Sequence, residues 1–247
     1  MKVIRLLICL HTVVCIISCK STIKEQKDKV YSRHLQRYVD LTIITTAMPD
    51  KKEEMNLLLF NDSKYLETTG AKKIIDSLYK KKKIQPFLLV AIDGKQGDYG
   101  LEESDNTEAK QYKKYNEFVI NELYPFVKKK TVIRKFNTVA ICGFGASAIS
   151  SFDIAWNNDE KIGMLGMFKP TFIKASNEST ILQTIEASRK RPNLKIWIAA
   201  NQPDSSALLF KNMMDNKKSI TECSLTASND ASQDADFTAF LLWAFPK

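Results

Sequence analysis

The chain has 247 residues, of which 44% are hydrophobic and 26% are charged, with only 8 Gly and 7 Pro. This composition excludes a disordered, fibrous or many-spanning membrane protein, and it fits one globular domain that buries its core without disulfide bonds. The formal net charge is +9. The excess lies in short runs such as Lys80–Lys83 and Lys128–Lys130, which at helix ends are typical of a solvated face, so the sequence predicts no nucleic-acid partner.

The amino terminus is predicted to be a leader. Residues 1–18 begin with two basic side chains, continue through an apolar run that is short for a bilayer span, and end directly before Cys19. Ile16-Ile17-Ser18-Cys19 resembles a bacterial lipobox, which implies lipid attachment at Cys19 and a cell-envelope protein, periplasmic or surface-exposed, held on the membrane by this anchor. Ordinary cleavage beside an incidental cysteine is the alternative. The polar residues 19–30 are interpreted as a tether before a single domain over residues 31–247.

The remaining chain alternates between β-branched or apolar runs and amphipathic segments. Strands are expected at 38–46, 56–60, 87–92, 138–142, 162–168, 194–199 and 221–226, and helices at about 69–82, 115–126, 147–157, 181–189, 206–215 and 235–244. Strands separated by helices predict an α/β fold with a mostly parallel sheet and helices on both faces.

The longest predicted connection covers residues 93–106 and is acidic. It carries Asp98, Glu102, Glu103 and Asp105. Because this connection follows a buried strand, we expect it to lie at the carboxyl ends of the strands, where the fold builds its site, as a polar loop or flexible lid at the rim of that site.

Gly143-Phe-Gly-Ala-Ser147 lies between a predicted strand and a predicted helix, where the α/β-hydrolase fold has its nucleophile elbow. The stretch 139–152 resembles the elbow of an esterase family that contains enterochelin esterases, S-formylglutathione hydrolases and feruloyl or acetyl esterases. Further matches cover most of the chain: residues 32–37, 57–62, 86–93, 116–126 and 161–170. The resemblance implies an α/β-hydrolase fold and an ancestry in carboxylic-ester hydrolysis.

The family chemistry requires a serine, a histidine and a carboxylate. The resemblance places these roles at Gly145, Ser228 and Asp204, so two of the three positions carry the wrong side chain. The chain has two histidines: His11 lies in the predicted leader, and His34 precedes the first long predicted strand, where we expect it to be remote from the site. No imidazole is therefore predicted for a conventional triad.

Three neighbouring residues remain as candidates for parts of the site. The backbone N–H groups of Ala146 and Ser63 occupy the positions that the resemblance assigns to the oxyanion hole, although serine is less free than the family glycine to adopt a positive φ in the turn at Asn61-Asp62-Ser63. Ser147 is the alternative nucleophile, but a serine at a helix start is usually a cap, and a base beside it is lacking.

Metal and cofactor chemistry is not predicted. Cys142 and Cys223 lie in predicted strands and are expected to be packed thiols rather than a disulfide or a metal pair. Asp62, Asp204 and Asp230 follow strands but are interpreted as solvated charges, so neither a metal nor a cofactor is expected.

Three functional hypotheses follow. The preferred one is a lipid-anchored pseudoenzyme that binds an unidentified small ligand or envelope protein at the former active site. The alternative is an active serine esterase on carbohydrate or siderophore-like esters that uses Ser147. A basic envelope protein that contacts anionic lipid or polysaccharide through its lysine runs is compatible with the first hypothesis.

Overall fold

The computed structural model describes residues 23–46, 55–99, 112–172, 180–201, 205–217, 222–228 and 233–247. The predicted leader and Cys19 lie outside this set. The strands are β1 (Lys24–Ser32), β2 (Arg37–Thr45), β3 (Met55–Asn61), β4 (Phe87–Ile92), β5 (Phe136–Phe144), β6 (Met164–Phe168), β7 (Lys195–Asn201) and β8 (Glu222–Ser228). The helices are α1 (Tyr65–Thr68), α2 (Ala71–Lys80), the 3₁₀ turn η1 (Gln96–Tyr99), the π-helix η2 (Phe118–Leu123), α4 (Tyr124–Thr131), α5 (Ala146–Asn157), α6 (Thr180–Ala187), α7 (Ser205–Asp215) and α8 (Gln233–Ala244).

The strands form one sheet in the order β1-β2-β4-β3-β5-β6-β7-β8. β2 is antiparallel to both β1 and β4, and the other neighbours are parallel. β3 and β4 are buried along their whole length, as expected for central strands covered on both faces. The predicted α/β fold is confirmed, and each predicted strand is present within a few residues of its expected bounds.

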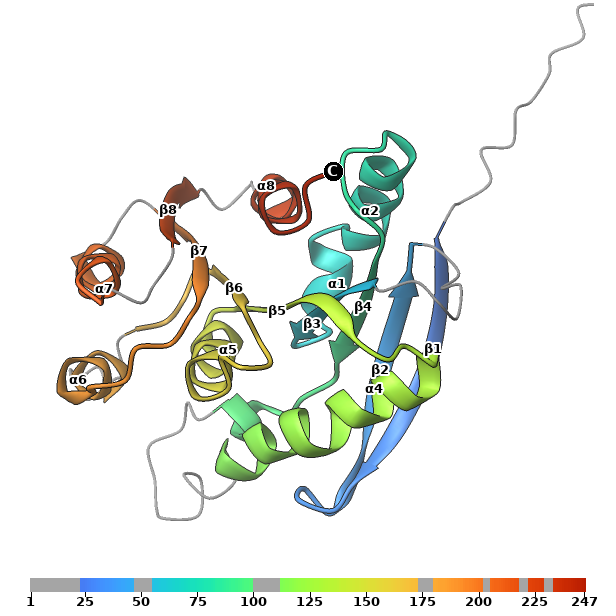
Figure 1. Cartoon of the computed structure of the whole chain (residues 1–247), viewed down its shortest axis with the longest axis horizontal. Coiled ribbons are helices and arrows are strands. Elements are labelled where there is room, and N and C mark those ends of the chain that lie inside the picture. The colour runs from blue at the N-terminus through green and yellow to red at the C-terminus, as the bar shows by residue number, and fades with distance from the viewer. Residues whose placement is uncertain are drawn as a thin grey trace, which may run out of the picture.

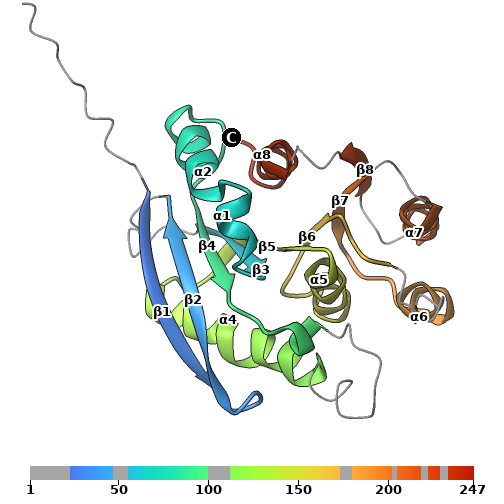
Figure 2. The same ribbon diagram turned by 180° about the vertical axis from the view of Figure 1, so that it is seen from behind.

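Helices cover both faces of the sheet (Figure 1). On one face α1, α2 and α8 pack over a core that includes Phe87, Phe237 and Phe240; on the other, α4, α5, α6 and α7 pack over a core that includes Tyr115, Phe152 and Phe210. Figure 2 shows the same two layers from behind. Across the described residues, we find no helix both long and apolar enough to cross a bilayer.

The helix that precedes β5 changes pitch along its length. Residues 112–117 are α-helical, η2 is a π-helix, and α4 continues to Thr131. Pro125 lies in the first turn of α4 and has no N–H to donate to the preceding turn, which explains why the wider π-turns occur directly before it. The predicted helix at 115–126 is therefore confirmed but is longer than expected.

The structure corrects the interpretation of residues 19–30 as a tether, because β1 begins at Lys24 and pairs with β2 over nine positions. β1 is an edge strand whose side chains are mostly exposed and charged. Its sequence lacks the apolar alternation of a half-buried strand, since an edge strand buries little and charged side chains protect its open edge from other chains. Only residues 19–23 can still serve as a tether.

Candidate functional site

The elbow predicted from the sequence is present between β5 and α5. Gly145 has φ 56° and ψ −116°, a conformation that side-chain-bearing residues adopt only at strained positions. Its N–H donates to the Phe168 carbonyl at 2.8 Å, and its carbonyl accepts from the Thr171 N–H at 3.3 Å. The segment after β6 therefore holds the sharp strand-to-helix turn of a nucleophile elbow, at a residue without a nucleophile.

Space for a side chain remains at this position. A Cβ added to Gly145 would have the Thr171 Oγ1 as its nearest neighbour, at 3.6 Å, which is an ordinary contact. No neighbouring group therefore fills the volume that a Cβ at Gly145 would occupy. Thr171 is exposed and is not recognisable as a site residue from the sequence, because only the close approach of the segment after β6 brings its hydroxyl to the elbow.

Ser147 has a structural role. It is 1% exposed, its Oγ accepts the Phe144 N–H at 2.9 Å, and the same Oγ lies 3.0 Å and 3.1 Å from the carbonyl oxygens of Phe144 and Asn61. Every one of these contacts ties the first turn of α5 to the ends of β5 and β3. The hydroxyl is committed to backbone groups and is closed to solvent, which is the environment of a cap rather than a nucleophile.

Asn61 also connects β3 to α5, and it contacts the helix that precedes β5 as well. It is fully buried at the end of β3, and its Nδ2 donates to the Ser151 Oγ at 3.1 Å and to the Ser147 carbonyl at 3.3 Å. The Tyr115 hydroxyl donates to its Oδ1. A hydrogen-bonded buried amide of this kind fixes β3, α5 and the helix before β5 in one arrangement.

The two candidates for the oxyanion hole, the N–H groups of Ala146 and Ser63, differ in their hydrogen bonding. Ala146 is the first residue of α5, so its N–H has no acceptor in a preceding helical turn. The Ser63 N–H, in contrast, donates to the Ile92 carbonyl at 2.8 Å and so belongs to the fold. The positive φ expected at Ser63 is found one residue earlier, at Asp62, where φ is 76°. Aspartate tolerates this conformation better than most residues because its side chain hydrogen-bonds locally.

Asp62 is 7% exposed, and its pKa is raised above the ordinary 3.8, mainly by burial and further by the nearby Asp93 carboxylate. A carboxyl whose pKa is higher in the folded state favours folding at low pH, and this contribution is lost as the pH rises through the folded pKa. We expect Asp62→Asn, which tolerates the same φ, to raise the free energy of unfolding at neutral pH, with the gain vanishing below the unfolded pKa.

Urea unfolding of both proteins across this pH range measures the effect. Asp40→Asn, which changes an exposed carboxylate, is the control and should alter stability little. A neutral-pH loss of stability in Asp62→Asn would contradict the assigned burial cost.

Ser228, at the position of the family base, ends β8 and is buried. Its hydroxyl donates to the buried Asp236 carboxylate of α8. Asp236 is not recognisable as a site residue from the sequence, because its only signal is its position on the last helix, eight residues after Ser228. Asp204 and Asp230 lie outside the described residues.

His34 lies in the turn between β1 and β2. Because β2 is antiparallel to β4 and its residue Leu41 pairs with Ile92 at the carboxyl end of β4, this turn projects beyond the same edge of the sheet as the elbow. His34 is nevertheless separated from the elbow across the sheet, because β2, β4 and β3 lie between it and β5. The expectation that it is remote from the site is therefore right across the sheet but wrong along the strands.

The loop after β4 differs from the predicted acidic lid. Asp98 is 1% exposed, forms an ion pair with Arg37 at the start of β2, and accepts the Lys95 N–H at 2.7 Å. This part of the loop is therefore anchored to the sheet. Glu102, Glu103 and Asp105 lie outside the described residues.

The described cysteines are both free thiols. Cys142 is buried, and Cys223 is half-buried and separated from it by β6 and β7. Burial raises the pKa of the Cys142 thiol well above its usual range and that of Cys223 to about 12, so neither is a reactive thiolate at neutral pH. Within the described ranges, no group of three or more His, Cys, Asp or Glu side chains is placed to bind a metal ion.

Comparison with known proteins identifies the class and then the family. A ferulic acid esterase superposes with a TM-score of 0.72 at 12% identity, with 91% of this chain and 98% of that chain covered. The ferulic acid esterase of the anaerobic fungus Anaeromyces mucronatus gives 0.69 at 16% identity, covering 90% and 91%. The enterobactin esterase of Shigella flexneri gives 0.70 at 15% identity, covering 90% of this chain and 59% of that one.

The fold is thus that of the α/β-hydrolase esterases, with the nucleophile elbow in its usual place. Residues 41–238 match the family described as Putative esterase, and the chain belongs to this family. A search of curated proteins finds no significant match.

Proposed function

We propose that the protein is an esterase-fold protein without serine-hydrolase activity, which binds a small ligand or an envelope protein at the carboxyl edge of its sheet and is held on a bacterial membrane by a lipid on Cys19. The observation that carries the loss of activity is the elbow: its backbone conformation is retained at Gly145, where no nucleophile exists.

The neighbouring groups do not restore the chemistry of acyl transfer. Ser147 is buried and bonded to backbone groups, and Thr171, although exposed, has no imidazole assigned to it. A hydroxyl without an adjacent base is a weak nucleophile at neutral pH. His34, the one histidine outside the predicted leader, is three strands away from β5 in the sheet.

The open volume and the polar backbone groups at the elbow support a binding role. The volume at Gly145 is open next to Thr171, and α5 begins there with the Ala146 N–H, so the elbow still presents polar backbone groups on a rigid support. The elements around it are fixed by the buried Asn61 amide. Binding at a preorganised surface needs no nucleophile, whereas hydrolysis does.

A fluorophosphonate probe tests the proposal directly. The full chain is incubated with the probe beside an active member of the family, and adducts are located by mass spectrometry. We expect no labelling of the folded protein, since no activated hydroxyl is present. Ser147→Ala and Thr171→Ala are the matched variants: stoichiometric labelling that is lost in either one would establish an active esterase with that residue as nucleophile.

The anchor is tested separately. Cys19→Ala should abolish incorporation of a fatty-acid label and move the protein out of the membrane fraction, while Cys142→Ala should change neither. Retention of the label in Cys19→Ala would exclude Cys19 as the attachment site.

A further inference from the structure

We propose that the amino edge of the sheet, opposite the elbow, is a surface for an anionic lipid bilayer. This inference rests on the proposed function in one respect: the anchor at Cys19 sets which side of the domain faces the membrane. The positive charge of the surface is taken from the structure. The inference extends the proposed function because it assigns a partner to a face that the candidate site does not use.

The cations on this edge come from the carboxyl ends of helices and from the connections that lead on into strands. Six exposed cations define the basic edge, namely Lys129 in the last turn of α4 and five residues in the connections before β4, β5 and β7: Lys81, Lys83, Lys135, Arg189 and Arg191. Helices in this fold run against the parallel strands, so their carboxyl ends meet at the amino edge of the sheet, where basic side chains also stabilise the helix ends.

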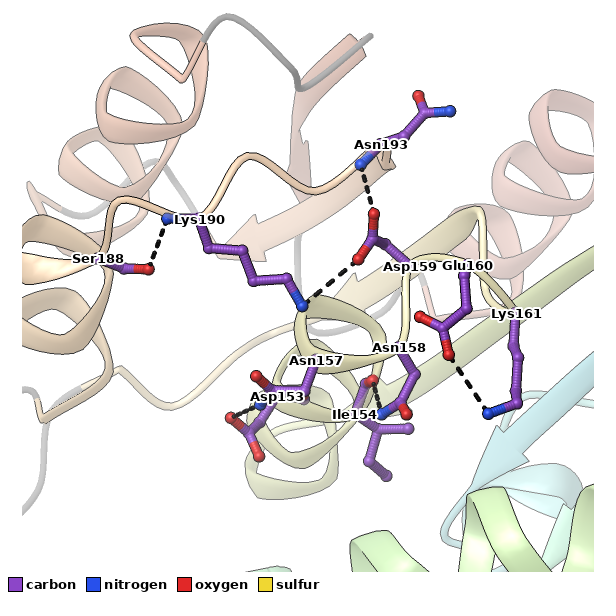
Figure 3. Close-up of polar contacts among 10 residues, drawn as sticks. All are labelled: Asp153, Ile154, Asn157, Asn158, Asp159, Glu160, Lys161, Ser188, Lys190 and Asn193. Atoms are coloured by element: carbon purple, nitrogen blue, oxygen red, sulfur yellow. Dashed lines mark hydrogen bonds and ion pairs between the residues drawn. The ribbon is translucent and has the colours of Figure 1, made fainter.

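Two of the acidic side chains on this edge are already paired with lysines. Asp159 and Glu160, in the connection between α5 and β6, lie 3.4 Å and 3.3 Å from the ammonium groups of Lys190 and Lys161 (Figure 3). Among the described residues, the ion pairs use cations other than those of the basic edge. The local acids therefore leave a positive excess for an external anionic surface.

Two hollows lie along part of the basic edge. A cavity of about 670 Å³ is lined by Lys135, Lys161, Lys195 and Trp243, together with the paired Asp159 and Glu160. A second cavity shares Lys161 and is also lined by Lys129 and Arg134. These cavities lie at the start of β5, β6 and β7, on the side of the sheet away from Gly145. The surface therefore offers lipid headgroups both positive charge and hollows lined by lysines.

The chain enters the domain on the same edge. Lys24 begins β1 and pairs with Thr45 of β2, which in turn pairs with Leu88 at the start of β4. In Figure 1 the start of β1 lies on the same side of the molecule as α2 and the carboxyl terminus. Only residues 20–23 separate Cys19 from Lys24, and these span at most about 18 Å when extended.

A lipid on Cys19 therefore keeps the basic edge close to the bilayer, where attraction to anionic headgroups acts over about one Debye length, near 10 Å. Single lipid chains bind reversibly, and a polybasic surface is a common second signal. The same orientation directs the carboxyl edge, with Gly145 and Thr171, away from the membrane.

The test is an amine-labelling footprint of the full lipidated chain on vesicles of phosphatidylcholine alone and of equal parts phosphatidylcholine and phosphatidylglycerol. We expect Lys81, Lys129 and Lys135 to be labelled several-fold more slowly on the anionic vesicles, with the protection lost at high salt. Lys113 and Lys114 belong to the same helical segment as Lys129 but lie at its opposite end, and they should be labelled equally on both.

Matched charge reversals separate the surface from the anchor. Lys81→Glu with Lys129→Glu should remove the protection of Lys135 on anionic vesicles, whereas Lys113→Glu with Lys114→Glu, an equal change of charge, should not. Equal labelling of both lysine groups on anionic vesicles would overturn the proposal even if Cys19 carries its lipid. Salt-sensitive protection by anionic vesicles in Cys19→Ala would support the surface although the anchor had failed. Protection by an anionic polysaccharide, with none by vesicles, would overturn the bilayer assignment.

Discussion

Gly143→Ala is expected to lower the free energy of unfolding by about 3 kcal/mol, because the new methyl group overlaps main-chain atoms rather than a movable side chain. A Cβ at Gly143 would lie 2.4 Å from the Ser147 carbonyl oxygen and 2.8 Å from the Ala148 nitrogen. α5 would have to move away from β5, and the hydrogen bonds of Ser147 to the ends of β3 and β5 would lengthen with it.

Urea unfolding, followed by tryptophan fluorescence, measures this loss. Gly163→Ala is the control, because no atom lies within 4 Å of its added Cβ, and its effect should stay within about 0.5 kcal/mol. If both variants were equally stable, the close approach of α5 to β5 would not be required by the fold.

Arg37→Met is expected to cost about 3–5 kcal/mol, since it leaves the Asp98 carboxylate buried without its cation. The side chains of Asp98 and Arg37 are 1% and 18% exposed. Adding Asp98→Asn to Arg37→Met should recover part of the loss, because the buried charge is then removed.

An exposed pair provides the comparison. Lys211 and Asp215 are joined at 2.5 Å but are 31% and 45% exposed, so Lys211→Met should cost no more than about 0.5 kcal/mol. A similar loss in Arg37→Met and Lys211→Met would show that Asp98 is solvated, as the prediction of an acidic lid implied.

The elements that position the site were predictable because their patterns are local. The buried runs at 56–60, 87–92 and 138–142 coincide with β3, β4 and β5, and the helix to residue 157 ends as expected. β1 was not predictable in the same way. Its polar and charged residues 24–29 have no apolar period, and they form a strand only because β2 offers a free edge.

The sequence by itself determined which chemical groups are present: glycine at position 145, two histidines in the whole chain, and cations before three strands. Residue type fixes a nucleophile or a charge without reference to the fold. The tertiary structure decided what each group is free to do. Ser147 is a buried cap, the Ser63 N–H is bonded to Ile92, and Asp98 is paired with Arg37, because segments distant in sequence supply those partners. Burial and hydrogen bonding depend on such contacts, which no local pattern encodes.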